Sequence, residues 1–502
     1  MELNAVRQTI TACRGVKECR EEIPFDCGMT LPDYYPDVMK ILRCGAEVFL
    51  GPPSGNQGGV EVSGTITATV CYLSEEGKLC GWSQKVPFTK ALSLQGEEPA
   101  AVSAKVLAKE VRCRALNKRR IEVSGTVSLG CTELITAQEE VLGSAEGKEI
   151  HLLHGALPFV NISGEFYRRF TFREDIPPEE GKPKVGNIIR SFSSAKVTEC
   201  RTVTDKIITK GELAVSIIWT PEEGENGSDV IVSQYTFPVS QIIDAPGVTG
   251  AHTCDARYLA APPDLTVTED GGMTLEVKIG AFARTYSENT SDIVCDMFST
   301  ECDCTCEKEQ IETVGKVVPV AETMEVRERA ELPESAKSVI ACWVEPGPPP
   351  ECDDAGNLVA KPKFCMFAQD EDGVPEYFEK SFEQKTEANI PPGSTVPLTD
   401  VDMTTENASA SISEGGAEIR FTLVLDGSIF LMDSAEAVTD CTLGERAPSG
   451  TKRMAMIIYY AEGDETLWQI AKKYRSAPEL IAEENGLTDS IPAAGTALLI
   501  PR

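Results

Sequence analysis

The chain has 502 residues, too many for one ordinary core, and its 41% hydrophobic and 25% charged content is typical of a globular protein with several domains. The 79 acidic against 47 basic residues give a net charge of −32, which repels polyanions and excludes nucleic acid and anionic lipid as partners. The chain contains neither an apolar N-terminal core of signal-peptide length nor a membrane-spanning apolar run, which predicts a cytoplasmic protein without membrane insertion.

The first 145 residues alternate apolar and polar side chains in runs typical of β-strands with one face towards solvent. The longest run carries the apolar set Val60, Val62, Ile66, Ala68, Val70 and Tyr72. Polar residues fill the positions between them, ending at an acidic turn at 75–77, and a partner strand follows at 82–90. Two more strands around a turn at 117–119 complete a first domain, 1–145, with an N-terminal extension.

The same order of elements returns about 150 residues later, and then a third time in a more degenerate form. A period of that length indicates copies of a whole domain, each large enough to bury its own core. The copies span 160–290 and 326–442, and Pro362 predicts a weakened strand in the third. The pattern predicts a mainly β fold of three tandem antiparallel β-sandwich-like domains. The segments 141–165, 291–325 and 443–456 are predicted to be linkers.

Eighteen cysteines are spread over the chain, and in a cytosolic protein they are expected to be reduced. Three of them, Cys302, Cys304 and Cys306, alternate in what reads as a polar loop of the 291–325 linker. Zinc sites usually pair C-x-x-C hairpins, which this segment lacks, so no metal site is predicted. The sequence leaves open whether these thiols oxidise to a disulfide.

No motif for catalysis or cofactor binding is present. The three histidines, His151, His154 and His252, do not accompany a nucleophile motif. Two carboxylates could act as glycosidase acids, but with 79 acidic residues the closeness of two of them is uninformative. We therefore expect a protein that is not an enzyme and has no cofactor.

The last segment, 457–502, forms a compact pattern of its own: strand, helix, helix, strand. Thr466 can cap a first helix whose apolar residues Leu467, Ile470, Ala471 and Tyr474 follow the helical period. A second helix begins near Pro478 and ends at Asn485-Gly486.

This segment resembles a LysM module through E-T-L-W-x-I-A-x-x-Y, Asn485 and the final L-L-I-P. The resemblance implies a βααβ fold and a shallow groove, for N-acetylglucosamine-containing glycans, between the loop before the first helix and the loop after the second. The corresponding residues here are Asp464, Glu465, Thr466, Leu467, Asn485, Gly486, Leu487 and Ile491. Asp464 replaces the usual glycine, with Gly463 one place early, and the module is acidic, which favours protein docking over glycan. Trp468 lies outside the apolar set and is a candidate partner anchor, the alternative being that it folds back over the small core.

The element L-P-D-x-x-P-D-[VI]-x-x-I-L at 31–42, the following strand motif, and tandem copies ending in a LysM module resemble the SPOCS-domain (spore-coat-associated) proteins of endospore-forming Firmicutes. The resemblance implies a sporulation protein of the mother-cell cytoplasm that acts in spore-coat morphogenesis at the forespore surface. Its partners would be the coat-basement morphogenetic ATPase and other coat proteins. The alternative is a protein that binds N-acetylglucosamine glycans of the peptidoglycan cortex, with the β domains as spacers.

Overall fold

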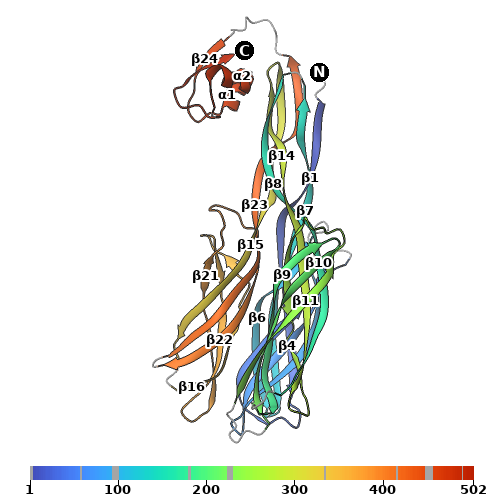
Figure 1. The fold of residues 1–502 in the computed structure, drawn as a ribbon, viewed down its shortest axis with the longest axis vertical. Coiled ribbons are helices and arrows are strands. Elements are labelled where there is room, and N and C mark those ends of the chain that lie inside the picture. Colours follow the sequence, from blue (N-terminus) through green and yellow to red (C-terminus); the bar gives the residue numbers. More distant parts are fainter. Residues whose placement is uncertain are drawn as a thin grey trace.

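The computed structural model describes residues 4–56, 59–92, 101–147, 149–178, 183–222, 230–332, 335–413, 416–446, 456–488 and 490–501. The fold is mainly β, as predicted, with three antiparallel units followed by a small βααβ module (Figure 1). Neither helix in the described part of the chain has the length and apolar character needed to cross a lipid bilayer.

The first unit is a two-sheet sandwich with a core of its own. One sheet has the order β1-β7-β6, and the other pairs β4 with β2, β3 and β5. The alternating set predicted at 60–72 lies in β4 and is buried in this core. The strands are β1 (Asn4–Thr30), β2 (Val38–Leu50), β3 (Ser54–Asn56), β4 (Gly59–Ser74), β5 (Leu79–Leu92), β6 (Ala101–Asn117) and β7 (Arg120–Glu146).

The second unit repeats this plan with a separate core. Its sheets are β11-β10-β9 and a four-stranded sheet in which β14 pairs with β8, β12 and β13. The strands are β8 (Ile150–Ile176), β9 (Val185–Val203), β10 (Lys206–Pro221), β11 (Ile231–Asp244), β12 (Thr253–Ala260), β13 (Asp264–Val267) and β14 (Met273–Ser299).

The third unit also has one sheet built on its two longest strands, β15-β23-β22. Its second sheet is divided in two, β16-β19-β20 and β17-β18-β21. The division falls at Pro362, between β18 and β19, because proline cannot donate a ladder hydrogen bond. The strands are β15 (Cys302–Ala330), β16 (Ser338–Glu345), β17 (Glu351–Cys352), β18 (Asn357–Ala360), β19 (Lys363–Gln369), β20 (Pro375–Ser381), β21 (Gln384–Glu387), β22 (Leu398–Ser413) and β23 (Gly416–Arg446).

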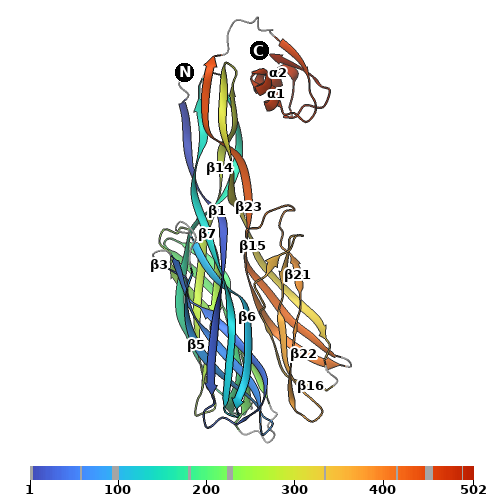
Figure 2. The same cartoon turned by 180° about the vertical axis from the view of Figure 1, so that it is seen from behind.

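Six strands are far longer than a sandwich needs, and their ends form a common stalk. The pairs β1/β7, β8/β14 and β15/β23 continue beyond their sandwiches and rise side by side (Figures 1 and 2). All six strands contribute to one apolar cluster: Ile10, Ala12, Val141, Leu157, Ile293, Ile311 and Ala437. The three units are therefore joined by a shared core in addition to their own.

The stalk corrects two of the predicted linkers. Segment 141–165 lies mostly in β7 and β8, and segment 291–325, with its cysteines, lies almost wholly in β14 and β15. Alternating polar residues made these segments look like loops. In each ribbon one face is apolar, and that face is buried only because the other two ribbons cover it.

The sandwiches also cover each other. Thr67 and Thr69, predicted to lie on the solvent face of their strand, are buried. Cys71 and Leu79 on the same face join Ile189 of β9 in a cluster that also includes Trp343, Cys365 and Phe367 of the third unit. The expected solvent face is thus partly an interface between copies.

Candidate functional site

The C-terminal module consists of β24 (Met456–Tyr460), α1 (Leu467–Tyr474), α2 (Pro478–Asn485) and β25 (Ala497–Pro501), with the two strands antiparallel. Thr466 caps α1 as predicted, through a capping box in which its hydroxyl accepts from Gln469 N–H while the Gln469 side chain accepts from Thr466 N–H. Gly486 ends α2 in the left-handed conformation that favours glycine. Local signals in the sequence therefore set the start of α1 and the end of α2.

The structure brings together the two loops that were predicted to form the groove. The Leu467 N–H at the start of α1 donates to the Ser490 carbonyl oxygen at 2.7 Å. Gly463, one place earlier than expected, has a φ of +94°, and a Cβ there would lie 2.7 Å from that of Ala494. The glycine is therefore needed at 463. Asp464, Gly486 and the half-exposed Ile491 are accessible and stay groove candidates.

Other predicted groove residues are held inside the module. The Asn485 amide donates to the carbonyl oxygens of Ile481 and Leu499, at 2.8 and 2.7 Å, and accepts from Leu499 N–H at 2.7 Å. Because the amide N–H groups and the carbonyl oxygen of Asn485 are all engaged, this side chain fastens α2 to β25 and has little hydrogen-bonding capacity left for a ligand. Leu487 packs against the module core.

Glu465 is also fixed from within the module. Its carboxylate accepts from the Tyr459 hydroxyl and lies 3.5 Å from the Lys473 ammonium. The hydrogen bond from Tyr459 lowers the pKa of Glu465. The binding role of the whole groove set stays a prediction, and its accessible part is smaller than the sequence indicated.

Trp468 is an anchor, but within the chain. Its indole Nε1–H donates to Asp296 Oδ2 of β14 at 2.8 Å, and its ring meets Phe298 edge-on at 4.9 Å. Phe298 is buried in the same apolar cluster as Ile470 and Ile481 of the module. The ring is therefore committed to the stalk rather than free for an outside partner.

The Asp296 carboxylate is the polar centre of this junction. It also accepts from the Lys472 ammonium at 2.7 and 2.8 Å and lies 3.2 Å from that of Lys308. Burial opposes its ionisation, but the hydrogen bonds from Lys472 and Trp468 outweigh it and lower the pKa of Asp296. The carboxylate is charged at neutral pH and holds α1 against the tip of the stalk.

Arg475 and His151 widen the junction. Arg475 donates to Asp303 of β15, and His151 of β8 stacks on Phe298 with Nδ1 3.6 Å from Glu479. None of these stalk residues was predicted from the sequence to hold the module, because nothing local marks the tip of a ribbon as a docking site. The one available signal was Trp468 itself, an aromatic outside the helical apolar set.

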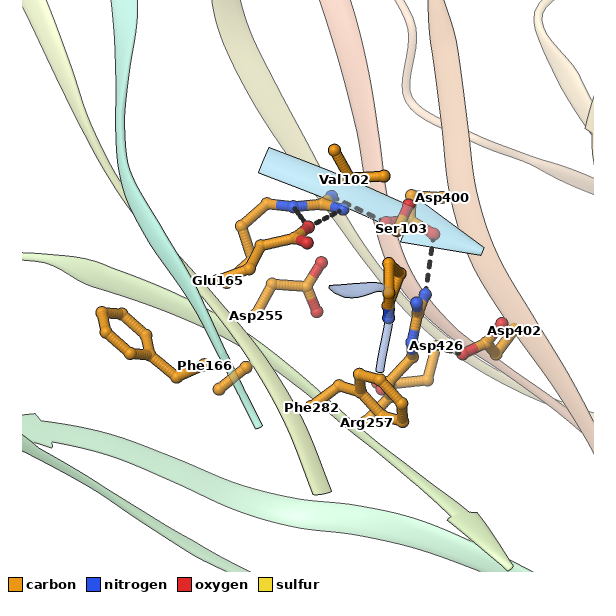
Figure 3. A pocket seen from close by; sticks show the side chains of 14 residues that line it. Val102, Ser103, Glu165, Phe166, Asp255, Arg257, Phe282, Asp400, Asp402 and Asp426 are labelled. Atoms are coloured by element: carbon orange, nitrogen blue, oxygen red, sulfur yellow. Dashed lines mark hydrogen bonds and ion pairs between the residues drawn. The ribbon is translucent and has the colours of Figure 1, made fainter. Parts of the chain in front are cut away.

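A second polar centre lines a small pocket to which all three units contribute residues (Figure 3). Asp400 of β22 is buried and accepts from Lys105 at 2.6 Å, Arg257 at 3.0 Å and Arg284 at 2.7 Å. Burial would raise its pKa, but the three cations hold it well below the usual range. Glu165 pairs with Arg284 on the other side at 2.6 Å.

The third polar centre repeats one strand position from each unit. Arg43, Arg190 and Trp343 are each the sixth residue of β2, β9 and β16 respectively. Both guanidinium groups lie over the Trp343 ring, at 5.5 and 5.0 Å from its centroid. Glu345 accepts from both arginines, and their charges lower its pKa to about 2 although burial acts in the opposite direction. The units therefore meet around a quasi-threefold axis.

The predicted cysteine cluster lies in the stalk. Cys304 and Cys306 have their sulfurs 3.8 Å apart, and Cys441 faces Cys306 in the ladder. All are free thiols. Within the described ranges, no set of three or more histidine, cysteine, aspartate or glutamate side chains is arranged to hold a metal ion.

Comparison with known proteins identifies two domains. The "SipL, SPOCS domain" family model matches residues 184–260, in the second unit, and the LysM domain model matches 461–501. The two domains fit a sporulation-related protein with a module of the glycan-binding type. No curated protein matches the chain.

Among solved structures, the di-domain ARO/CYC StfQ from the steffimycin biosynthetic pathway matches at 11% identity. The match covers 52% of this chain and 84% of that one, with a TM-score of 0.08, and carries no argument about fold or function.

Proposed function

We propose that this chain, which carries a SPOCS domain and a LysM domain, is a non-catalytic assembly protein of the spore coat. Its tandem β units dock coat components at the forespore surface, and its C-terminal module engages a partner there. The observation that carries the proposal is the occurrence of both domains, over 184–260 and 461–501, in one chain.

The joined architecture supports an assembly role. The three sandwiches are joined by the common core of the stalk and therefore present several faces at fixed separations. Weak contacts at several fixed sites combine through effective concentration. The junction at Asp296 holds the module at the far end of the stalk from the sandwiches (Figure 1). The molecule can therefore bridge components on two sides of a layer.

A protein partner for the module is favoured by its surface. Along β24, Met456, Ile458 and Tyr460 point outwards and are 43%, 65% and 65% exposed. A row of exposed apolar side chains is typical of a protein docking surface. With the acidic Asp464 loop, this surface fits the proposed partner, the coat-basement morphogenetic ATPase, better than a neutral glycan.

The alternative is a binder of N-acetylglucosamine glycans of peptidoglycan. The LysM match and the joining of the two loops through Leu467 and Ser490 favour it. One shallow groove buries little area and binds weakly on its own, so this function would need several copies of the chain on one glycan.

Capture experiments with the full chain separate the two functions. The purified protein is incubated with insoluble peptidoglycan, with and without chitooligosaccharide, and separately with the purified ATPase. Capture of the ATPase without glycan retention supports the proposal. Retention on peptidoglycan that chitooligosaccharide abolishes, with no ATPase bound, would replace it with the alternative.

A matched pair of substitutions tests the groove. Asp464→Lys and Glu483→Lys both reverse an exposed acidic charge of the module, but only the first lies in the predicted groove. Loss of binding in Asp464→Lys alone assigns the groove to whichever partner is captured. A fluorescent fusion in sporulating cells should decorate the forespore in the wild type, and a diffuse mother-cell signal would contradict a coat function.

A further inference from the structure

The three sandwiches enclose a chamber along their quasi-threefold axis. It consists of two adjoining hollows of about 540 and 320 Å³, which share Val48, Lys109, Lys196, Glu345 and Met403 in their walls. These volumes lie in the range of small-molecule sites. All three units contribute to the lining, so the chamber exists only in the assembled chain.

One cation in the chamber has no acidic partner. The Lys109 side chain, on β6, lines both hollows and is exposed to solvent. Within the described part of the chain its ammonium makes no hydrogen bond and no ion pair.

Its cationic neighbours are paired, and the contrast singles Lys109 out. Arg190 bonds to Glu47 and Glu345, each at 2.9 Å, and Lys196 to Glu406 at 2.8 Å. Each of these side chains lies in the wall of the larger or smaller hollow. Among the described cations that line the hollows, Lys109 is therefore the one left to pair with an anionic ligand.

Two buried guanidinium nitrogens in the same wall also lack an acceptor. They are Nη1 of Arg43 and Nε of Arg190. Both arginines are close enough to Lys109 for their charges to act on it. Neither nitrogen is exposed to solvent, so the two arginines add positive charge beside Lys109 and no donor that a ligand in the hollow reaches.

The wall of the larger hollow is mostly apolar, whereas the smaller hollow is lined by polar and apolar groups in similar measure, Glu47, Glu212 and Glu406 among them. Phe192, Trp343 and Val344 line the smaller hollow, and Leu50, Val106 and Pro348 line the larger. Apolar walls with a few converging polar groups are the usual composition of a small-molecule site.

We infer that the chamber binds a small organic anion, with its carboxylate or phosphate on Lys109 and its apolar body against Val106 and Pro348 in the larger hollow. The two head groups share the chemistry that the donors recognise. A bound anion would also cross-link the three units, because the wall residues belong to all of them.

Isothermal calorimetry with the full chain tests this, using phenyl phosphate and benzoate as separate probes and benzyl alcohol as the uncharged control. One probe should bind at one site per chain, and the alcohol should bind at least about tenfold more weakly, as expected for loss of a charge-assisted hydrogen bond. The tighter of the two anions identifies the head group.

Lys109→Met keeps the apolar stem and removes the charge, and should weaken the anion about tenfold or more. Lys109→Arg should bind within about threefold of the wild type, and Lys210→Met, a surface control on β10, should bind as the wild type. Circular dichroism and Tm check that each variant is folded. Absence of binding by both anions, equal binding of benzyl alcohol, or unchanged binding in folded Lys109→Met would overturn the inference.

Discussion

The junction between the module and the stalk depends on the Asp296 carboxylate, and Asp296→Ala should release the module. The carboxylate is 11% exposed and accepts a neutral bond from Trp468 and a charged one from Lys472. Because Lys472 is 41% exposed, its share is reduced by solvent, and the two contacts together contribute about 2 kcal/mol. That energy corresponds to a change of about thirtyfold in the equilibrium between docked and released module.

Hydrogen–deuterium exchange followed by mass spectrometry measures this opening. In Asp296→Ala, peptides from the end of β14 and from α1 should exchange faster, while those from the three sandwich cores keep their rates. Asp292→Ala is the matched control, since Asp292 lies on the same strand and its exposed carboxylate pairs with His154, at 3.0 Å. Unchanged exchange in Asp296→Ala, or the same change in both variants, would refute the role given to this carboxylate.

The junction should also respond to pH. The pKa of Asp296 is below its ordinary value of 3.8 in the folded chain. Its contribution to docking is therefore complete above about pH 4 and is lost as the pH falls through the lowered pKa. Exchange measured at decreasing pH should show the module released before the sandwiches unfold, and release that begins near neutral pH would contradict this assignment.

Three further predictions concern stability. Glu345→Gln leaves two buried guanidinium groups without their shared carboxylate and should lower the free energy of unfolding in urea by about 3–5 kcal/mol, and a loss under about 1 kcal/mol would contradict the pairing. Asn485→Ala removes three internal hydrogen bonds, which together contribute about 2 kcal/mol. Hydrogen exchange at the β25 amides should therefore be about thirtyfold faster, while the rates of β1–β23 stay unchanged. Burial raises the pKa of Asp426 to about 6, so the folded state favours the neutral carboxyl. The free energy of unfolding should therefore fall by about 2 kcal/mol between pH 4 and pH 7. Asp426→Asn should flatten this pH dependence, and an unchanged profile in that variant would contradict the assignment to Asp426.

Local sequence patterns were enough to predict several of the strands and helices. The alternation at 60–72 predicted β4, and Thr466 with the apolar period predicted α1, because a strand and a capped helix are specified by residues within reach of one another. Pro362 predicted a weakened strand for the same reason, and the structure has a break there, between β18 and β19. The order of elements in the module followed directly.

The candidate site was less predictable. Family resemblance gave the groove loops, but it could not show that the Asn485 amide is used internally or that Trp468 is bound by Asp296, which lies 172 residues away in the chain. Those outcomes depend on which surfaces meet. The linkers predicted at 141–165 and 291–325 failed for the same reason, since a ribbon with one apolar face is stable only when other ribbons cover it.

By itself the sequence determined a chain of three repeated β units and a βααβ module, since period, turns and caps are local. Only the tertiary structure decided that the units share a stalk, that the stalk holds the module, and that a chamber lies between the sandwiches. Arg43, Arg190 and Trp343 show why. These residues occupy equivalent positions in three diverged copies, but nothing in the sequence relates them to one another. Only the quasi-threefold arrangement of the units places the two guanidinium groups against one indole ring and Glu345.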